Sequence, residues 1–283
     1  MQDLAPGVYF HEGDPKAGTC NNGWIVMDEY VVEVDANFPS GAQVVIPKIR
    51  AITRKPIRFV VDTHFHPDHS SGNETWVREC GSVVVAQAAT LDRLRLSGAA
   101  IWALQARTRP DIAASRLHLP DVSFLDTMAF EDSGHRVELR YLGPAHTDGD
   151  ALVWLPRERI LFTGDVCVNG SYNFLHDGHL VGWIGVLNQA AGLGPRIVCP
   201  CHGPRGGPEI LADQARYFGE LLRGVRSLVD SGDTLKEAES AGPGLAGELR
   251  AIPAVSRYVP TDYWFRFQVE KAYSEITGRP LAD

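Results

Sequence analysis

The chain has 283 residues, of which 44% are hydrophobic and 22% charged, and its net charge is −8. This composition excludes a disordered, collagen-like or disulfide-stabilised miniprotein, and an acidic chain without a basic run is not expected to bind long nucleic acids. The chain has no apolar stretch near the ~18 residues of a membrane span, so no membrane partner is expected. Its first ten residues show no signal-peptide pattern, and its five cysteines are sparse. The chain is therefore expected to be cytoplasmic.

Strands and helices are expected to alternate along the chain. The expected strands are residues 7–10, 24–34 with a turn at 28–29, 57–61, 82–86, 137–142, 151–155, 160–163 and 196–199. The expected helices are residues 40–52, 90–114, 181–193, 210–230, 234–240 and 263–276, with the glycine-proline segment 242–244 and Pro253 separating the last three. Residues 13–23, rich in turn formers, are expected to form a hairpin tip or loop.

This order of elements predicts an α/β protein in which two sheets lie between layers of helices. Residues 1–207 are expected to form the main domain. The helical segments of residues 208–283 are expected to pack on that domain rather than to stand alone.

The strongest chemical signal is the run His64-Phe65-His66-Pro67-Asp68-His69, directly after the apolar strand 57–61. Alternate side chains of an extended segment share a face, so His64 and His66 can reach one metal ion. Pro67 ends the strand, which leaves Asp68 and His69 in the following loop, able to reach a second ion. Zinc readily takes such nitrogen and oxygen ligands. The alternative, a polar loop with incidental histidines, is disfavoured because histidines buried without partners are costly.

Three later residues, like the HFHPDH run, come after an expected strand. His146 comes after the strand 137–142, Asp165 after 160–163, and His202 after 196–199. Sites of α/β proteins collect where strands give way to loops. Each residue alone is a weak signal, because a lone histidine after a strand is more often structural. Together, however, they place the same kinds of metal ligand at several strand ends.

The motif HFHPDH resembles the H-x-H-x-D-H signature of the metallo-β-lactamase superfamily, and GPAHTDGD, FTGDV and PCHG resemble its later metal-binding segments, in order. The resemblance covers about residues 7–205. It implies an αββα sandwich of two mixed β-sheets flanked by helices, here with a helical C-terminal extension, and a dinuclear metal site at one edge. By this resemblance His64, His66 and His146 bind one metal, Asp68, His69 and His202 bind the other, and Asp165 bridges them.

Two residues depart from the familiar pattern. Asp165 stands where the best-known β-lactam-hydrolysing branch has a cysteine, which is closer to the glyoxalase II, lactonase and phosphodiesterase branches. Cys201 stands where many relatives have glycine, and Cys199 and Cys201 either pack in the core or touch the site. The expected cofactors are two zinc ions, with iron or manganese as alternatives, because histidine and aspartate ligands do not distinguish these metals.

Such a site favours hydrolysis. A pair of divalent ions lowers the pKa of bound water to about 7 and holds nucleophile and electrophile together. The expected function is a dinuclear zinc-dependent hydrolase whose metal-bridging hydroxide attacks a small-molecule ester, lactone, thioester or amide, β-lactams included, with Asp68 steering the hydroxide or accepting its proton. The alternatives are a small-molecule phosphodiesterase, an iron-dependent oxidoreductase of the same fold and a non-catalytic, metal-stabilised binding module; the oligomeric state is open.

Substrate contacts are expected from residues 169–179, which follow Asp165. Their side chains either donate hydrogen bonds to a developing oxyanion or form a polar surface loop. Residues 13–23 and 94–124 are expected to wall the cleft, where Trp102 either contacts substrate or packs in the core. The named candidates are Asn169, Tyr172, His176 and His179 for substrate, and Asp62 and Thr63 for orienting a ligating histidine or capping loop amides.

Overall fold

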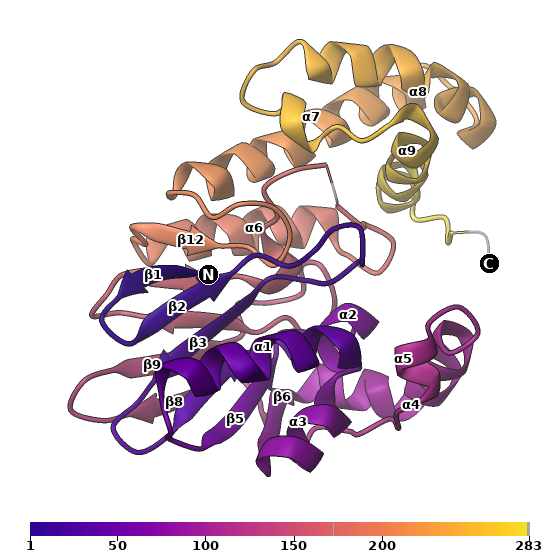
Figure 1. Cartoon of the computed structure of the whole chain (residues 1–283). Helices are drawn as coiled ribbons and strands as arrows, with labels where there is room; N and C mark the ends of the chain where they lie inside the picture. Colours follow the sequence, from indigo (N-terminus) through magenta and orange to yellow (C-terminus); the bar gives the residue numbers. More distant parts are fainter. Residues whose placement is uncertain (172, 282–283) are drawn as a thin grey trace.

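The computed structural model describes residues 1–171 and 173–281. Tyr172, a predicted substrate contact, lies outside the described residues. The described chain forms two sheets stacked between two layers of helices (Figure 1), which confirms the predicted αββα sandwich.

The first sheet runs through the N-terminal half in simple sequence order. Its strands β1 to β4 pair antiparallel, whereas β4 to β7 pair parallel. Parallel strands carry the ends of β4, β5 and β6 to one edge of the sheet, where side chains that follow them can meet. The strands are β1 (Gln2–Ala5), β2 (Val8–His11), β3 (Asn22–Val26), β4 (Val31–Val34), β5 (Ile57–Asp62), β6 (Val83–Gln87) and β7 (Val122–Phe124).

The second sheet has the order β12-β11-β10-β9-β8 and is antiparallel except for the parallel pair β11 and β12. That parallel pair again brings two strand ends together, with Phe162 opposite Cys199 in the register. The strands are β8 (Thr127–Glu131), β9 (Arg136–Arg140), β10 (Leu152–Leu155), β11 (Ile160–Phe162) and β12 (Ile197–Cys199).

Hydrophobic cores lie between the layers. Phe10, Val61, Leu139 and Phe162 fill the space between the two sheets. A second cluster packs the outer face of the first sheet on its helices, and a third joins the second sheet to the C-terminal helices. The helices are α1 (Pro39–Ile52), α2 (Pro67–Ser70), α3 (Asn73–Cys80), α4 (Ala88–Gln105), α5 (Pro110–Ala113), α6 (Leu180–Gly192), α7 (Glu209–Asp230), α8 (Leu235–Arg250) and α9 (Asp262–Thr277), with 3₁₀ turns at η1 (Gly164–Val166) and η2 (Ser256–Tyr258).

The C-terminal helices α7, α8 and α9 lie in the upper part of Figure 1 and share the third core with α6. Phe265 of α9 and Trp183 of α6 belong to the same buried cluster. The boundary between residues 207 and 208 stays a prediction. Within the described residues, none of the helices combines the length and the apolar character that crossing a membrane requires.

Three expectations about the elements were wrong. The helix expected over 90–114 is split into α4 and α5, because Pro110 begins a new helix at its first position. The segment 242–244 does not end a helix: α8 begins with a capping box at Thr234 and continues through Pro243. Strands β1, β7 and β8 were not expected, because their runs are short and mostly not buried.

Candidate metal centre

The predicted ligands follow strand ends that meet at one edge of the sandwich. The HFHPDH run comes directly after β5 and continues into α2, whose first residue is Pro67, so Asp68 and His69 lie in a short helix and not in the expected loop. His146 lies in the connection from β9 to β10, Asp165 in η1 after β11, and His202 after β12. Residues up to 138 positions apart in the sequence therefore reach one place.

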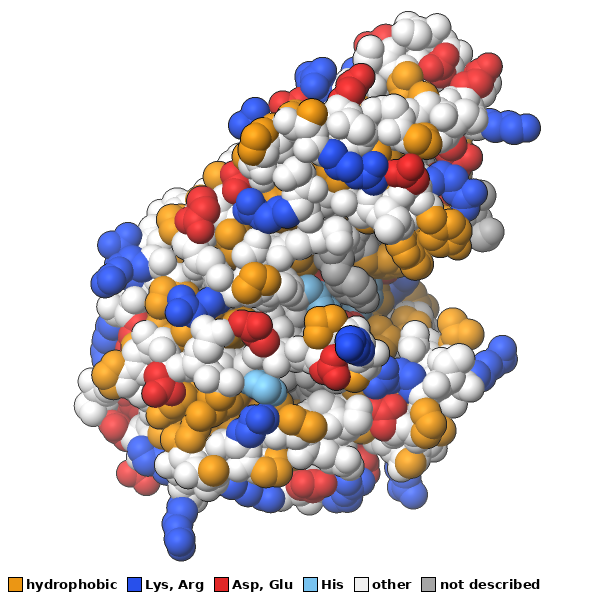
Figure 2. All heavy atoms as spheres, turned by 45° about the horizontal axis from the view of Figure 1, so that its top comes forward, with side chains coloured by type: hydrophobic (Ala, Val, Ile, Leu, Met, Phe, Trp, Pro, Cys, Tyr) orange, Lys and Arg blue, Asp and Glu red, His pale blue; other side chains and the backbone are white. Residues whose placement is uncertain are grey.

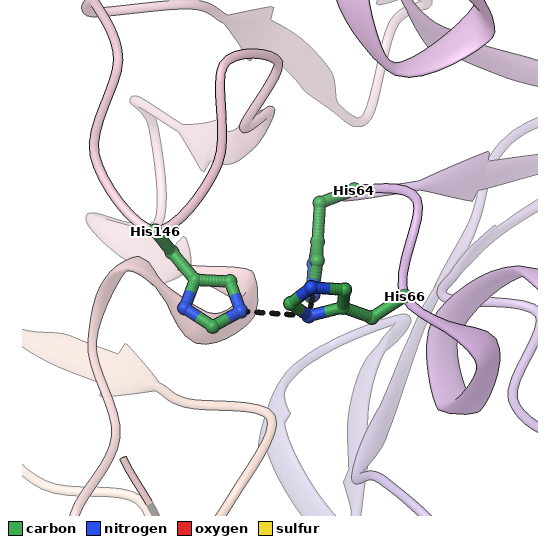
Figure 3. A group of neighbouring side chains, drawn as sticks. All are labelled: His64, His66 and His146. Atoms are coloured by element: carbon green, nitrogen blue, oxygen red, sulfur yellow. Dashed lines mark hydrogen bonds between the residues drawn. The ribbon is translucent and has the colours of Figure 1, made fainter. Parts of the chain in front are cut away.

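The first group consists of His64, His66 and His146. The Nδ1 atom of His66 lies 3.0 Å from Nε2 of His64 and 2.9 Å from Nε2 of His146. Figure 3 shows the three rings turned toward one another, from two different loops. Three imidazole nitrogens thus converge within reach of a single ion.

The second group consists of Asp68, His69 and His202. The Oδ2 atom of Asp68 lies 3.1 Å from Nε2 of His202 and 3.4 Å from Nε2 of His69. Like the first group, these side chains offer one nitrogen or oxygen each within ligand distance of a common point. The donor set therefore suits a divalent ion.

Asp165 lies between the two groups. Its Oδ2 atom is 3.6 Å from Nε2 of His146 and 3.5 Å from Nε2 of His202, and its Oδ1 atom is 3.7 Å from Nε2 of His69. Gly164 permits this approach: it has a φ of +54°, and a side chain there would meet the Thr63 hydroxyl at 2.6 Å. One carboxylate thus faces a nitrogen from each group.

The hydrogen bonding of these side chains fits resident metal ions. Nε2 of His69 and Oδ1 of Asp165 are buried and make no hydrogen bond to any described residue. A buried polar atom that makes no hydrogen bond costs about 1–3 kcal/mol, and a metal ion bound by these atoms would remove that cost. The residues present therefore fit the group that the sequence motif implies.

The electrostatics of His64 and His146 favour metal binding, whereas the neighbouring aspartates, against the effect of burial, raise the pKa values of His69 and His202. Burial, together with the neighbouring histidines, lowers the pKa values of His64 and His146 well below 6.5. Both rings are therefore neutral near pH 7, and neutral imidazole is the form that binds metals.

The carboxylates of the site differ in their electrostatics. Burial by itself would raise the pKa of Asp68, but His69 and His202 beside it hold that pKa well below its ordinary value. Burial raises the pKa of Asp165, against the opposing effect of His202 and His69. Asp68 is therefore the carboxylate held most firmly in its charged form.

Asp35, at the end of β4, is a residue of this centre that sequence reasoning missed. Its Oδ1 accepts hydrogen bonds from the Thr63 backbone N at 2.9 Å and the Thr63 hydroxyl at 2.7 Å. Its Oδ2 lies 3.2 Å from Nδ1 of His69 and 2.7 Å from the Cys201 sulfur. Asp35 thus fixes the ring of one predicted ligand, and a carboxylate just after an apolar strand was the signal that could have revealed it.

The two residues expected to orient a histidine have separate roles. The Thr63 hydroxyl lies 3.2 Å from Nδ1 of His64, so Thr63 links that ring to Asp35. Asp62 instead accepts a hydrogen bond from Asn73 Nδ2 at 2.7 Å and ties β5 to α3. Thr63 therefore has the contact that the prediction requires, whereas Asp62 holds the scaffold.

Cys167, Cys199 and Cys201 do not join the two ligand groups. Cys199 packs between the two sheets, and Cys167 packs in the core beside α6. Cys201 is buried and donates to Asp35, so of the two alternatives for this pair, Cys199 belongs to the core and Cys201 borders the site.

Two residues of the loop before α6 contact His66 and were also missed. Oδ2 of Asp177 lies 3.0 Å from Nε2 of His66, which leaves Nδ1 of that ring facing the other histidines. Burial opposes the charge of Asp177, but the hydrogen bond to His66 lowers its pKa. The Phe174 ring packs edge-on against His66, with 5.5 Å between ring centroids.

The described substrate candidates lie at the rim rather than among the ligands. Asn169 donates to the Pro204 carbonyl at 2.9 Å, and His179 lies 2.7 Å from Oδ1 of Asp148. His176 is exposed beside Asp177, at 3.9 Å. Contact of Asn169, His176 and His179 with a substrate therefore stays a prediction.

A cavity of about 200 Å³ opens beside His202. The loop between β2 and β3 forms one wall of this cavity, which confirms the expectation for residues 13–23. Residues 94–124, which were also expected to form a wall, do not line the cavity. Trp102, in that segment, is half-buried. Asn21 ties this wall to the His202 loop by donating to the carbonyls of Pro200 and Gly203, both at 2.8 Å. The cavity lining is Pro15, Gly18, Thr19, Val168, Gly170, Ser171, His202 and Gly203.

Comparisons with known proteins give relatives that are named for different activities. The chain is 25% identical over 213 residues to a linear primary-alkylsulfatase of a Pseudomonas species, covering 63% of this chain and 40% of that protein. It is 28% identical over 118 residues to a metallo-beta-lactamase type 2 of Bacteroides fragilis, covering 40% of this chain and 47% of that protein. The matches thus span less than half the length of these two relatives.

The fold is similar to that of solved metallo-beta-lactamases. A solved metallo-beta-lactamase from Pontibacter korlensis superposes with a TM-score of 0.62 at 22% identity, covering 77% of this chain and 97% of that one. The family model described as Metallo-beta-lactamase superfamily matches residues 18–202, a range that contains both ligand groups and Asp165. With its sandwich and its converging histidines and aspartates, the chain belongs to the metallo-β-lactamase superfamily.

Proposed function

We propose that the chain is a metal-dependent hydrolase that holds two ions, zinc in the simplest case. His64, His66 and His146 would hold one ion, Asp68, His69 and His202 the other, with Asp165 between them. The observation that carries the proposal is the position of Asp165, 3.5–3.7 Å from a nitrogen of each group.

Ions bound there would lower the pKa of water to about 7 and polarise a carbonyl or phosphoryl oxygen. The chain supplies the placement of the ligands, through Asp35 on His69 and Asp177 on His66. Asp68 stays ionised because His69 and His202 flank it, so its carboxylate can bind an ion and accept a hydrogen bond that steers the attacking hydroxide.

The proposed substrate is a small ester, lactone, thioester or amide. Two divalent ions would bring a charge of +4 against −2 from Asp68 and Asp165, which favours negative charge developing on a substrate oxygen. The absence of a strongly basic composition (net charge −8) supports small molecules rather than long nucleic acids as partners.

A primary alkyl sulfate is a second candidate substrate, because one relative, 25% identical, is named for that activity. Phosphodiester hydrolysis and iron-dependent oxidation stay as alternatives. Visible absorption of the purified protein would separate iron from zinc, because zinc complexes of these ligands are colourless.

The proposal is tested with zinc-reconstituted protein and a panel of ester, lactone, thioester, β-lactam, phosphodiester and alkyl sulfate substrates. We expect turnover of an acyl substrate and a loss of about 100-fold or more in kcat/KM in His66→Ala, because one ion loses a ligand. The control is His118→Ala, since that ring pairs with Asp121 at 3.1 Å and belongs to neither ligand group. Full activity in His66→Ala would contradict the proposal.

A further inference from the structure

Helix α9 exposes a cluster of aromatic side chains near its N-terminal end. Tyr263 is 64% exposed, Trp264 58% and Phe267 39%. Their rings contact one another, with centroids 5.2–5.8 Å apart. Large apolar side chains that cluster at the surface mark binding sites more often than scattered ones do.

This aromatic cluster adjoins the loop that contacts the metal centre. Gln268 of α9 donates to the Asn173 carbonyl at 3.0 Å, and Glu275 accepts from the Leu180 backbone N at 2.8 Å. One face of α9 therefore lies along residues 173–180. Trp264 stands one turn before Gln268 on the same face of the helix, because side chains four residues apart are neighbours.

The same loop extends the apolar surface to the predicted ligands. Phe174 follows Asn173, is 47% exposed and packs against the His66 ring. Figure 2 shows hydrophobic side chains of the C-terminal part bordering the hollow beside the exposed histidines. Phe174, which contacts His66, and the aromatic cluster of α9, which the Gln268–Asn173 hydrogen bond brings beside the same loop, are together called the apolar path.

We propose that this path binds the apolar chain of the substrate, so that the preferred substrates carry a long alkyl or acyl group on the hydrolysed bond. The inference rests on the proposed hydrolase function and names its substrate class. Because one end of the path lies at His66, in the metal centre, we assign the path to the apolar chain of a substrate bound there. Aromatic faces bind alkyl chains by removing apolar surface from water.

The test compares p-nitrophenyl esters with acyl chains from acetyl to dodecanoyl on zinc-reconstituted protein. We expect kcat/KM to rise about two- to fourfold for each added methylene over part of the series. Trp264→Ala should flatten this rise, with a loss that grows with chain length and falls mainly on KM. Leu96→Ser, which changes an 81% exposed residue on α4, is the matched control and should keep the wild-type profile.

A binding measurement separates this inference from the proposed function. Titration calorimetry with decanoate and butyrate should show decanoate binding at least about tenfold tighter, and Trp264→Ala should remove that difference. If decanoate is preferred but no ester is turned over, the proposed hydrolase function fails while the apolar path stands.

Two results would overturn the inference. One is ester hydrolysis with no dependence on chain length, unchanged in Trp264→Ala. The other is a wild-type dimer that Trp264→Ala converts to a monomer in light scattering, which would assign the aromatic cluster to a second copy of the chain.

Discussion

Asp35 shows how much of the metal centre depends on a single buried carboxylate. It accepts two hydrogen bonds from Thr63 and faces His69 and Cys201 with its other oxygen. A carboxylate on the far nitrogen of a ligating histidine fixes the ring and raises its basicity. Asp35 is therefore a positioning residue that acts through His69 and Thr63.

We expect Asp35→Asn to weaken metal binding by about 10–100-fold, because the amide cannot accept from every partner of the carboxylate. Competition with a chromophoric chelator measures this affinity. Asp62→Asn is the matched control: Asp62 is also fully buried at a strand end, but it bonds Asn73. Equal losses in the two variants would argue that burial, and not contact with the ligands, decides the effect.

At the scale of elements, the loop between β2 and β3 forms a wall of the cavity beside His202. Arg109, just before α5, holds this loop from outside. Its Nη1 donates to the Ala17 carbonyl at 2.9 Å, its Nη2 pairs with Asp111 at 3.2 Å, and its guanidinium lies 3.5 Å from the centre of the Phe38 ring. Segments far apart in the sequence thus fix one wall of the cleft.

We expect Arg109→Ala to loosen residues 13–19, because a charge-assisted hydrogen bond and a cation–π contact are lost together. Hydrogen exchange should be faster there, with β10 and β11 unchanged, and the free energy of unfolding should fall by about 1–2 kcal/mol. Arg95→Ala is the control, since Arg95 is exposed and pairs with Asp92, three positions before it in the same helix. Unchanged exchange at residues 13–19 in Arg109→Ala would show that the loop is held by other contacts.

For the whole molecule, the sandwich was predictable because apolar runs mark buried strands such as β5 and β6. The ligand candidates were predictable because each follows such a strand. Asp35 follows β4 in the same way, but it stands alone in the sequence, without neighbouring histidines that would single it out. Asp177 has no strand before it, and only the folded loop brings it to His66.

Tertiary packing explains the remaining differences. Helix α8 continues through Pro243, and its buried residues Leu245, Ala246 and Leu249 share a core with Phe265 and Val269 of α9, an arrangement that local propensity does not reveal. Strands β7 and β8 expose most of their side chains and pair at sheet edges, so their sequences lack the apolar pattern of the inner strands.

In the proposed enzyme, two groups of side chains that folding brings together hold a pair of metal ions. Elemental analysis of zinc-reconstituted, dialysed protein tests it most directly, with circular dichroism to establish that the chain is folded. We expect about two zinc ions per chain, falling to about one in His66→Ala. Folded wild-type protein that retains no metal would contradict the account.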